Sequence, residues 1–416
     1  MSMRFNVGRN LVILALVMTL WASIASATPG TITVGPSDYD YTSIQAAIDA
    51  AAPGDTIEVQ ASGSPYQETL TISTADLHIY VPGDCVVIDG GGAEVVVTIQ
   101  ADGVQFSGFT VQSGSVRIAV ERANGVRLQW NTLSGWFYHT ETLIRLNQTR
   151  DALVRGNVLQ GSAKEGIVLI EAEESRVIEN RIDGNLGVAI RLDRASGNTL
   201  SGNEVLGAYV GIGLLDSSGN LLEENRFTGV YGGFYLKGSD GNVLRRNQGR
   251  GGSIEGNGNL VLENDFTAIG EGEYVFQVNG ARNLIRDNRL DGEGVMEVAL
   301  FILGDGNVVE RNLVYNTPGI GVDTSGENLI VGNDIWRNRI GVSASPGTTL
   351  RFNRIYDNAR FGLEQKIPAQ GTVDARWNWW GYVSGPYHPD LNPEGEGDEV
   401  SDGIEFTPWL DSPPRQ

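Results

Sequence analysis

The sequence predicts an all-β protein folded as a single-stranded parallel β-helix, a solenoid in which the strands of successive coils stack on one another. The first observation is an Asn that recurs twelve times from Asn131 to Asn378, which is 247 residues in 11 steps, or about 22 residues per step. The second is a phrase between these positions, as in Gly211-Ile212-Gly213-Leu214, whose apolar residues alternate as in β-strands. The third is that the repeat has no helical period, which excludes leucine-rich and all-helical solenoids.

The recurring Asn belongs to the longer phrase N-x-[L/V/I]-x-x-N, for which we expect a structural role. An Asn at a bend between strands tolerates left-handed backbone angles. Identical Asn side chains that stack at the strand spacing of about 4.8 Å can also hydrogen-bond to one another as a ladder. Complete copies of the phrase begin at Asn198, Asn220, Asn242, Asn259, Asn283, Asn307 and Asn328.

Residues 1–27 have the pattern of a secretory signal peptide. Two arginines precede the apolar run from Leu11 to Leu20, and Ala25-Ser26-Ala27 supplies small residues before an expected cleavage at Thr28. The apolar run is shorter than the roughly 20 residues of a membrane-spanning helix, and no second apolar stretch follows. We therefore expect a secreted or periplasmic protein with no transmembrane segment after cleavage.

The charge balance limits the kinds of partner. The chain has a formal charge of −21, and loss of the two signal-peptide arginines leaves 30 − 2 = 28 basic residues against 51 acidic ones, or −23. Nucleic acids and anionic membranes bind basic surfaces, so neither is an expected partner. The single cysteine, Cys85, cannot form an internal disulfide, and its place in an apolar run, Cys85-Val86-Val87-Ile88, predicts a core residue.

Residues 28–75 are predicted to form an N-terminal cap and the first strands. A short helix precedes a strand at Thr56–Val59 and would cover core and strand edges that the open end of a solenoid exposes. The apolar residues on one face of this helix are Ile44, Ala47, Ile48 and Ala51.

Several segments carry a more specific resemblance, namely Tyr41–Ile48, Gly54–Val59, Pro65–Glu68, Cys85–Gly92 and Gly103–Thr110. They are similar to the opening of proteins of the pectin-lyase-like superfamily, such as pectin methylesterases and the periplasmic, copper-binding accessory proteins of nitrous-oxide reductase. The resemblance covers essentially the whole mature chain and implies a right-handed parallel β-helix. It implies a fold rather than an activity, because these phrases reflect a coil geometry that many functions share.

Two segments depart from the regular repeats, which we assign to residues 76–381. The long step after Asn131 carries an aromatic run in which Trp136 and Tyr138 are candidates for stacking on sugars, or for packing over a neighbouring coil. The closing phrase Trp377-Asn378-Trp379-Trp380 is expected to cover the last coil, and residues 382–416 to form a C-terminal cap and tail.

One strand face is predicted to gather a cation, a carboxylate, a phenol and an amine. Alignment by distance from the Asn phrase places Arg191 and Asp193 two coils from Tyr235 and Lys237, roughly 10 Å apart at about 4.8 Å per coil. In lyases and epimerases of the superfamily that the chain resembles, Lys or Arg removes a proton next to a uronate carboxylate, which Ca²⁺ or a second cation neutralises. For chemistry of this kind, Lys237 or Arg191 is a candidate base and Tyr235 a candidate acid.

Other carboxylates lie at or beside the same columns. Asp193 and Asp216 are an alternative pair for glycoside hydrolysis or for Ca²⁺, and Asp216 and Glu171 are candidate substrate contacts. The catalytic phrases of pectate lyases, pectin methylesterases, polygalacturonases and alginate epimerases are not found, so no catalytic residue is carried over from these families.

Two functions are therefore left open by the sequence. The protein either binds or processes a polysaccharide along its exposed strand face, as a lyase, epimerase or glycosidase, or it is a non-catalytic envelope protein with a structural, adhesive or accessory role. A copper-binding role is disfavoured, because the mature chain offers only Met296, Cys85 and three scattered His residues, whereas soft metals need clusters of such ligands. No cofactor is assigned, and Ca²⁺ is the candidate ion.

Overall fold

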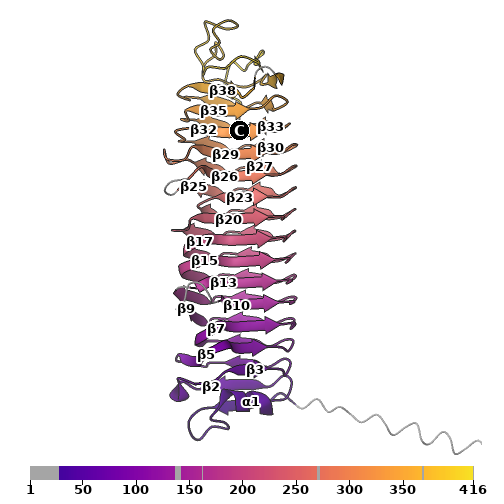
Figure 1. The fold of residues 1–416 in the computed structure, drawn as a ribbon, viewed down its shortest axis with the longest axis vertical. Helices are drawn as coiled ribbons and strands as arrows, with labels where there is room; N and C mark the ends of the chain where they lie inside the picture. The colour runs from indigo at the N-terminus through magenta and orange to yellow at the C-terminus, as the bar shows by residue number, and fades with distance from the viewer. Residues whose placement is uncertain (1–27, 136–141, 162, 269–271, 368–369, 416) are drawn as a thin grey trace, which may run out of the picture.

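The computed structural model describes residues 28–135, 142–161, 163–268, 272–367 and 370–415. In this part the chain forms a parallel β-solenoid of about 14 turns, with 52% of residues in strands and 3% in helix, which confirms the predicted fold class. Figure 1 shows the coils stacked into a long column from the indigo N-terminal end to the yellow C-terminal end. The predicted signal peptide and the candidate residues Trp136 and Tyr138 lie outside the described residues.

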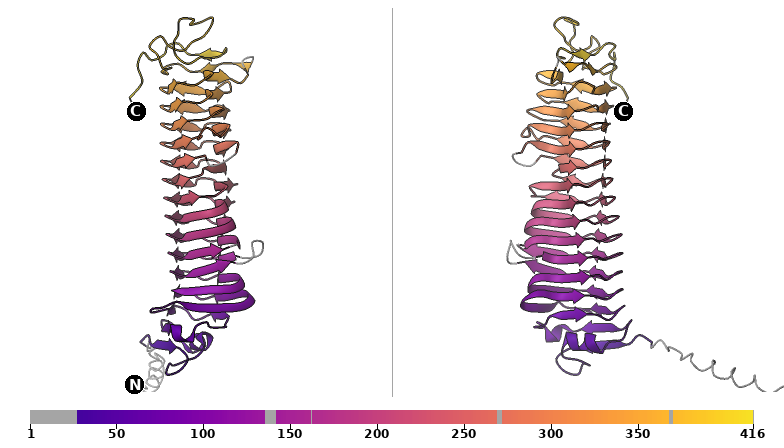
Figure 2. Two further views of the ribbon diagram at one scale, coloured as in Figure 1. Left: turned by 90° about the vertical axis from the view of Figure 1, so that its left-hand side faces the viewer. Right: turned by 45° about the vertical axis from the view of Figure 1, so that its right-hand side comes forward.

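Most coils have three short strands, which define three faces of the column. In one coil these are β18 (Leu221–Glu223) on face A, β19 (Arg226–Thr228) on face B and β20 (Gly232–Lys237) on face C. Each strand pairs in parallel with its counterparts in the coils before and after it, as Figure 2 shows. Residues about 22 apart in the sequence are therefore neighbours in space.

Face A forms a 17-stranded sheet within the described residues. Besides β18 its strands are β1 (Thr31–Val34), β2 (Thr56–Val59), β4 (His78–Tyr80), β6 (Gln105–Ser107), β8 (Arg127–Gln129), β11 (Leu153–Arg155), β14 (Arg176–Ile178), β16 (Thr199–Ser201), β21 (Val243–Arg245), β24 (Leu260–Leu262), β27 (Leu284–Arg286), β30 (Val308–Glu310), β33 (Leu329–Val331), β36 (Thr349–Arg351), β39 (Val373–Asp374) and β40 (Ile404–Glu405).

Faces B and C share a 23-stranded sheet in the described chain, because some long strands run round the corner between them. The long strands are β5 (Val86–Ile99), β7 (Phe109–Glu121), β15 (Arg181–Asp193) and β17 (Glu204–Leu215). The other strands of face B are β9 (Thr132–Gly135), β12 (Val158–Gly161), β22 (Gln248–Gly249), β25 (Asp265–Thr267), β28 (Arg289–Asp291), β31 (Leu313–Tyr315), β34 (Asp334–Trp336) and β37 (Arg354–Tyr356). Those of face C are β3 (Leu70–Ile72), β10 (Thr142–Asn147), β13 (Ala163–Ile170), β23 (Gly252–Glu255), β26 (Tyr274–Asn279), β29 (Val298–Leu303), β32 (Ile320–Ser325), β35 (Ile340–Ala344) and β38 (Phe361–Gln365).

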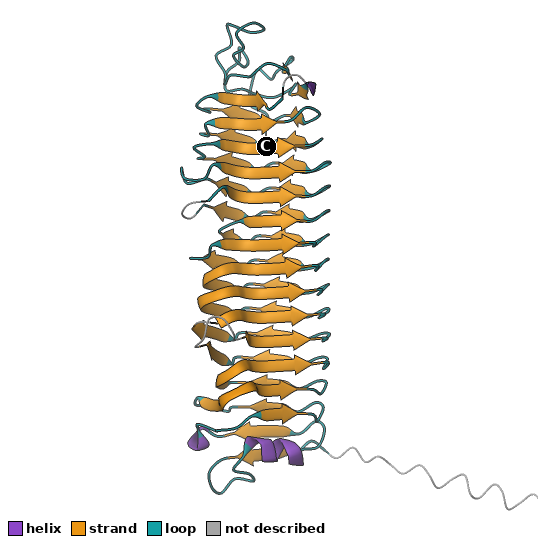
Figure 3. Cartoon of the chain, in the orientation of Figure 1, coloured by secondary structure: helices purple, strands orange, loops and turns teal. Residues whose placement is uncertain are grey.

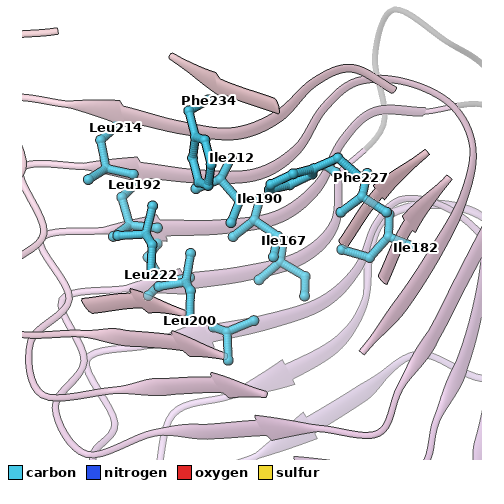
Figure 4. Close-up of a cluster of buried hydrophobic side chains, with 14 of the residues drawn as sticks. Ile167, Ile182, Ile190, Leu192, Leu200, Ile212, Leu214, Leu222, Phe227 and Phe234 are labelled. Atoms are coloured by element: carbon cyan, nitrogen blue, oxygen red, sulfur yellow. The ribbon is translucent and has the colours of Figure 1, made fainter. Parts of the chain in front are cut away.

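One continuous apolar core runs along the inside of the column. On face C, Ile190 pairs with Ile212 and Leu192 with Leu214, and all four side chains are fully buried. Figure 4 shows these residues in rows that continue from coil to coil. The predicted alternation is confirmed, because Arg191 and Asp193, which lie between the buried positions, remain partly accessible to solvent.

Two ladders of buried Asn side chains hold the bends before faces A and B. Asn203 Nδ2 donates to Asn225 Oδ1 at 2.9 Å, and Asn225 Nδ2 donates to Asn247 Oδ1 at 3.0 Å. The predicted structural role is confirmed, but the expected backbone conformation is wrong. The residue before the Asn takes the left-handed conformation, as Glu224 and Arg246 do with φ of 55° and 53°.

The N-terminal end of the column is covered as predicted. Helix α1 (Ile44–Ala50) buries Ile44, Ala47 and Ile48, and the Oγ of its N-cap residue Ser43 accepts a hydrogen bond from the N–H of Ala46 at 3.2 Å. Figure 3 shows this helix in purple at the end of the stacked strands. A single 3₁₀ turn, η1 (Ala61–Gly63), follows β2.

The last coil is covered by an aromatic residue of the closing segment. Trp380 is fully buried, and a Cβ built at Gly362 of β38 would lie 3.3 Å from its ring. Trp379 packs its ring against Tyr356 at a centroid distance of 5.4 Å. This packing confirms the predicted cap role of Trp380, whereas Trp379 lies partly exposed against an outward ring of face B.

The predicted burial of Cys85 is wrong. Cys85 is exposed, and its Sγ lies 3.0 Å from Thr110 Oγ1. Strand β5 begins one residue later, so that Val86 and Ile88 occupy the inward positions. Among the residues that the structure describes, no helix has the length and apolarity needed to cross a lipid bilayer.

Candidate functional site

Face C brings four predicted site residues into two parallel columns. Arg191 pairs with Gly213, which pairs with Tyr235, so these three residues form the first column. In the second column, Asp193 and Lys237 are separated by one residue, Leu215, in the same way. The cation and the phenol therefore lie two coils apart, roughly 10 Å at the usual strand spacing.

Arg191 is held by carboxylates on two sides. Its Nε lies 2.8 Å from Glu165 Oε1, close enough for an ion pair although not aligned as a hydrogen bond, and its Nη1 donates to Asp193 Oδ2 at 3.2 Å. Asp193 also accepts a hydrogen bond from Arg194 at 2.7 Å. Since two acids share the charge of Arg191, this guanidinium is better suited to positioning than to removing a proton.

Glu165 was not among the predicted residues. It lies in β13, pairs in register with Val188 and is 8% exposed. When the coils were aligned by their distance from the Asn phrase, only the two outward positions nearest the turn were compared. Glu165 occupies an earlier outward position on the preceding coil. Extending that alignment by one more outward position would have identified it.

Tyr235 and Lys237 lie on the same strand and point outward. Tyr235 is half-buried and Lys237 is exposed. No ion pair between Lys237 and a carboxylate occurs in the part of the chain that the structure describes, although Glu255 is its register neighbour on β23. The amine of Lys237 is therefore available to a ligand.

Glu171 and Asp216 lie in the turns after face C rather than on the strand face. Both take left-handed backbone angles, with φ of 50° and 48°. Glu171 accepts hydrogen bonds from Gln148 Nε2 at 2.8 Å and from Arg194, and these two donors lower the pKa of its carboxyl. The two acids border the second column, because each directly follows a residue of that column, Ile170 or Leu215.

A ladder of rings on face B was also not predicted. Tyr315 stacks on Trp336 with a centroid distance of 4.5 Å, and Trp336 stacks on Tyr356 at 6.1 Å. Beside them Asp334 is 6% exposed and lies 3.0 Å from Arg354, and burial raises the pKa of this carboxyl while Arg354 opposes the shift. Because the rings use their faces on one another, the ladder stabilises the stack rather than offering a platform for a ligand.

Potential metal ligands are scattered in the described part of the chain. No group of three or more His, Cys, Asp and Glu side chains there is arranged to hold an ion. Met296 is fully buried, and His388 Nδ1 accepts hydrogen bonds from the backbone of Asp390 and Leu391 at 3.2 Å each. His78 stacks on Tyr80, and burial lowers the pKa of its imidazole. These residues do not fit a copper centre.

Comparison with known proteins gives one family and several related folds. The sequence model of the family described as periplasmic copper-binding protein (NosD) matches residues 70–248 and 251–389. No curated protein is significantly similar to the chain.

Two solved structures of DFA-IIIase from Arthrobacter chlorophenolicus A6 in complex with GF2 share the fold. The first is 13% identical and covers 70% of this chain and 92% of that chain, with a TM-score of 0.54. The second, without its lid, is 16% identical and covers 68% and 94%, also with a TM-score of 0.54. These neighbours are right-handed β-helices, which agrees with the predicted hand of the solenoid.

Proposed function

The chain belongs to the NosD family of periplasmic proteins, and from this premise we propose that it works in the periplasm, where it binds a polysaccharide along face C. Residues 1–27 would direct its export and be removed before Thr28. The observation that carries the proposal is the juxtaposition of Arg191, Tyr235 and Lys237 in two adjacent columns of one strand face. A phenol, an amine and a fixed guanidinium can donate several hydrogen bonds to the hydroxyl groups of a sugar chain.

The same residues support catalysis less well than binding. In a lyase reaction Lys237 would remove the proton and Tyr235 would donate one to the leaving group. A second cation would have to neutralise the sugar carboxylate, but Arg191 is already balanced by Glu165 and Asp193. Ca²⁺ would then have to take this role, so the catalytic version needs an ion that the binding version does not.

A non-catalytic accessory role is the second candidate, and the family match favours it. The family description names copper, yet the soft-metal side chains in the described residues lie apart from one another, and we assign them no step in copper handling. In this version the column would serve as a scaffold for a periplasmic partner.

The first test is to incubate the purified mature protein with a panel of neutral and uronate polysaccharides, with and without Ca²⁺. Binding is measured by affinity electrophoresis, lyase activity by ultraviolet absorbance of unsaturated products, and hydrolysis by new reducing ends. Lys237→Ala should weaken binding, whereas Arg176→Ala, which removes an exposed cation from face A, should not.

Each outcome has a distinct meaning. Absorbance that disappears in Lys237→Ala would establish a lyase, and new reducing ends would shift attention to Asp193 and Asp216. Binding without products supports the proposed function. Failure to bind any polysaccharide in the panel would overturn it and leave the accessory role.

A further inference from the structure

The lysines of this acidic protein are confined to one face. The chain contains three of them, Lys164, Lys237 and Lys366, while its other basic residues are arginines. Lys164 lies in β13 and Lys237 in β20, and Lys366 follows β38, with its backbone N–H bonded to Ala344 of β35. All three therefore lie on face C or at its edges.

Two of these amines have no carboxylate partner among the residues that the structure describes. Lys366 forms an ion pair with Asp323 and donates to Ser325 Oγ at 2.9 Å. Lys164 and Lys237 are exposed, and neither is paired with an acid in the described ranges of the chain. A lysine amine that is not shared with an internal acid can bind the carboxylate of a ligand.

A pair of exposed rings lies at the corner between faces B and C. Tyr209 and Tyr231 are 58% and 59% exposed, and their rings stack in parallel with a centroid distance of 4.9 Å and an angle of 3°. Stacking on Tyr231 uses only one face of the Tyr209 ring. Exposed aromatic surface of this kind is typical of binding sites.

The other face of Tyr209 looks over a position without a side chain. Because Val188 pairs with Val210, the residue in register with Tyr209 on the preceding coil is Gly187. One coil earlier the register residue is Lys164, since Glu165 pairs with Val188. Lys164 and Tyr209 therefore stand on either side of Gly187.

The gap over Gly187 has room for one sugar ring. Two coil spacings amount to about 9.6 Å. A ring in van der Waals contact on both sides needs about 7–8 Å, because each contact takes 3.5–4.0 Å. Gly187 cannot be replaced by a larger residue without a shift, since a Cβ there would lie 2.7 Å from the carbonyl oxygen of Lys164. The backbone itself thus keeps this position clear.

We propose that this corner of face C binds a uronate oligosaccharide, an inference that rests on the proposed polysaccharide-binding function and names its ligand class. The C–H face of one pyranose packs on Tyr209, and its carboxylate binds the amine of Lys164. A second carboxylate farther along the same chain binds Lys237, which lies three coils from Lys164, or roughly 14 Å along the column, and six residues, or up to roughly 20 Å, across face C.

The negative charge of the whole protein does not prevent this binding. At physiological ionic strength the Debye length is about 8 Å, so acids on distant coils are largely screened. Near Lys164 the acids Glu165 and Asp193 share Arg191, whereas Glu255 is the register neighbour of Lys237 on β23. The local field near Lys164 is therefore set mainly by its own amine, while Glu255 weakens the field of Lys237.

The test is calorimetric titration of the mature protein with an oligogalacturonate of defined length. A gluco-oligosaccharide of the same length is the neutral match, and oligoglutamate is a carboxylated ligand without sugar rings. The variants are Tyr209→Ala, Lys164→Gln and Lys237→Gln. Matched controls are Tyr382→Ala, which removes a ring that is 55% exposed in the C-terminal cap, and Arg176→Gln on face A.

Oligogalacturonate should bind more tightly than either comparison ligand. Tyr209→Ala should weaken binding about 5- to 10-fold, as expected for loss of a stacking contact. Each lysine variant should weaken it about 5-fold at low salt and reduce its dependence on salt, because one charge contact is lost. Neither control should change the affinity. Thermal melts of all variants should match the unaltered protein, since the substituted side chains are exposed.

Several results would overturn the inference while leaving the proposed function intact. One is oligogalacturonate binding that none of the three variants affects. Another is equal or tighter binding of the neutral oligosaccharide, which would contradict the ligand class. Equal binding of oligoglutamate would show that carboxylates alone are recognised. If no saccharide binds, the inference and the proposed function fail together.

Discussion

Asp398 is expected to make the protein less stable as the pH rises from about 4 to about 6. Asp398 ends a third, short ladder of hydrogen bonds between coils. In this ladder the backbone N–H of Thr317 donates to Asn338 Oδ1, and the backbone N–H of Asn338 donates to Asn358 Oδ1. Asp398 Oδ2 accepts hydrogen bonds from the backbone N–H of Asn358 at 3.0 Å and from its Nδ2 at 2.8 Å. Burial raises the pKa of this carboxyl to about 6, and the hydrogen bonds from Asn358 only partly oppose the shift.

The sign of the effect follows from proton binding. The folded state holds the proton of Asp398 more tightly than the unfolded state, in which the pKa is 3.8. The contribution to stability is therefore complete below about pH 4 and is lost as the pH rises through about 6. A shift of about 2.2 units at 1.36 kcal/mol per unit sets the loss at about 3 kcal/mol or less above pH 7.

Asp398→Asn isolates this contribution. The amide oxygen can keep both hydrogen bonds from Asn358 and continues the ladder without a charge. Urea unfolding of both proteins from about pH 4 to about pH 7.5 gives the difference in unfolding free energy, in which the titration of the other carboxylates cancels. We expect this difference to rise from near zero to about 2–3 kcal/mol in favour of the variant. A difference that is constant with pH, or that falls, would refute the reasoning.

Three further predictions concern the ladder, the helix and the ion pairs of face C. Asn225→Ala should lower the unfolding free energy by about 3–5 kcal/mol, because buried donors and acceptors in both neighbouring coils lose their partners, whereas the less buried Asn279→Ala should cost under about 1 kcal/mol in the same urea titration. Ser43→Ala should cost about 1 kcal/mol through loss of the helix cap, measured as a lower midpoint of thermal unfolding, and an unchanged midpoint would contradict the capping role. Arg191→Ala should destabilise the protein by about 2–3 kcal/mol because Glu165 is left buried without its partner. The double variant Arg191→Ala/Glu165→Ala should recover part of that loss, and strictly additive losses would contradict the pairing.

The relation between sequence and site is clearest on face C. The regular Asn phrase allowed Arg191 and Tyr235 to be assigned to one column, because parallel coils of constant length bring equivalent positions into register. Glu171 and Asp216 lie beside the columns as expected, but in turns with left-handed backbone angles rather than on strands. Distance along the chain does not distinguish the last residue of a strand from the first residue of a turn.

Side-chain contacts between coils could not be predicted in the same way. Arg191 extends to Glu165 on the preceding coil, and this contact depends on rotamers as well as on register. Cys85 lies in an apolar run, yet it is exposed because β5 starts one residue later. A shift of one residue exchanges the inward and outward faces of a strand, so a short apolar run alone cannot specify which residue is buried.

The sequence by itself determined the repeat, the parallel β-helix, the ladders and the helix that caps the first coil, because each follows from local spacing and from the need to bury apolar side chains between coils. Only the tertiary structure decided that Lys164 and Tyr209 flank Gly187, or that Lys237 lacks an acid partner within the described chain while Arg191 has two. These relations join residues on different coils and depend on the corner between faces B and C, where two long strands bend. The repeat length determines which residues of neighbouring coils are in register. The bend and the side-chain conformations determine which charged and aromatic groups come into contact.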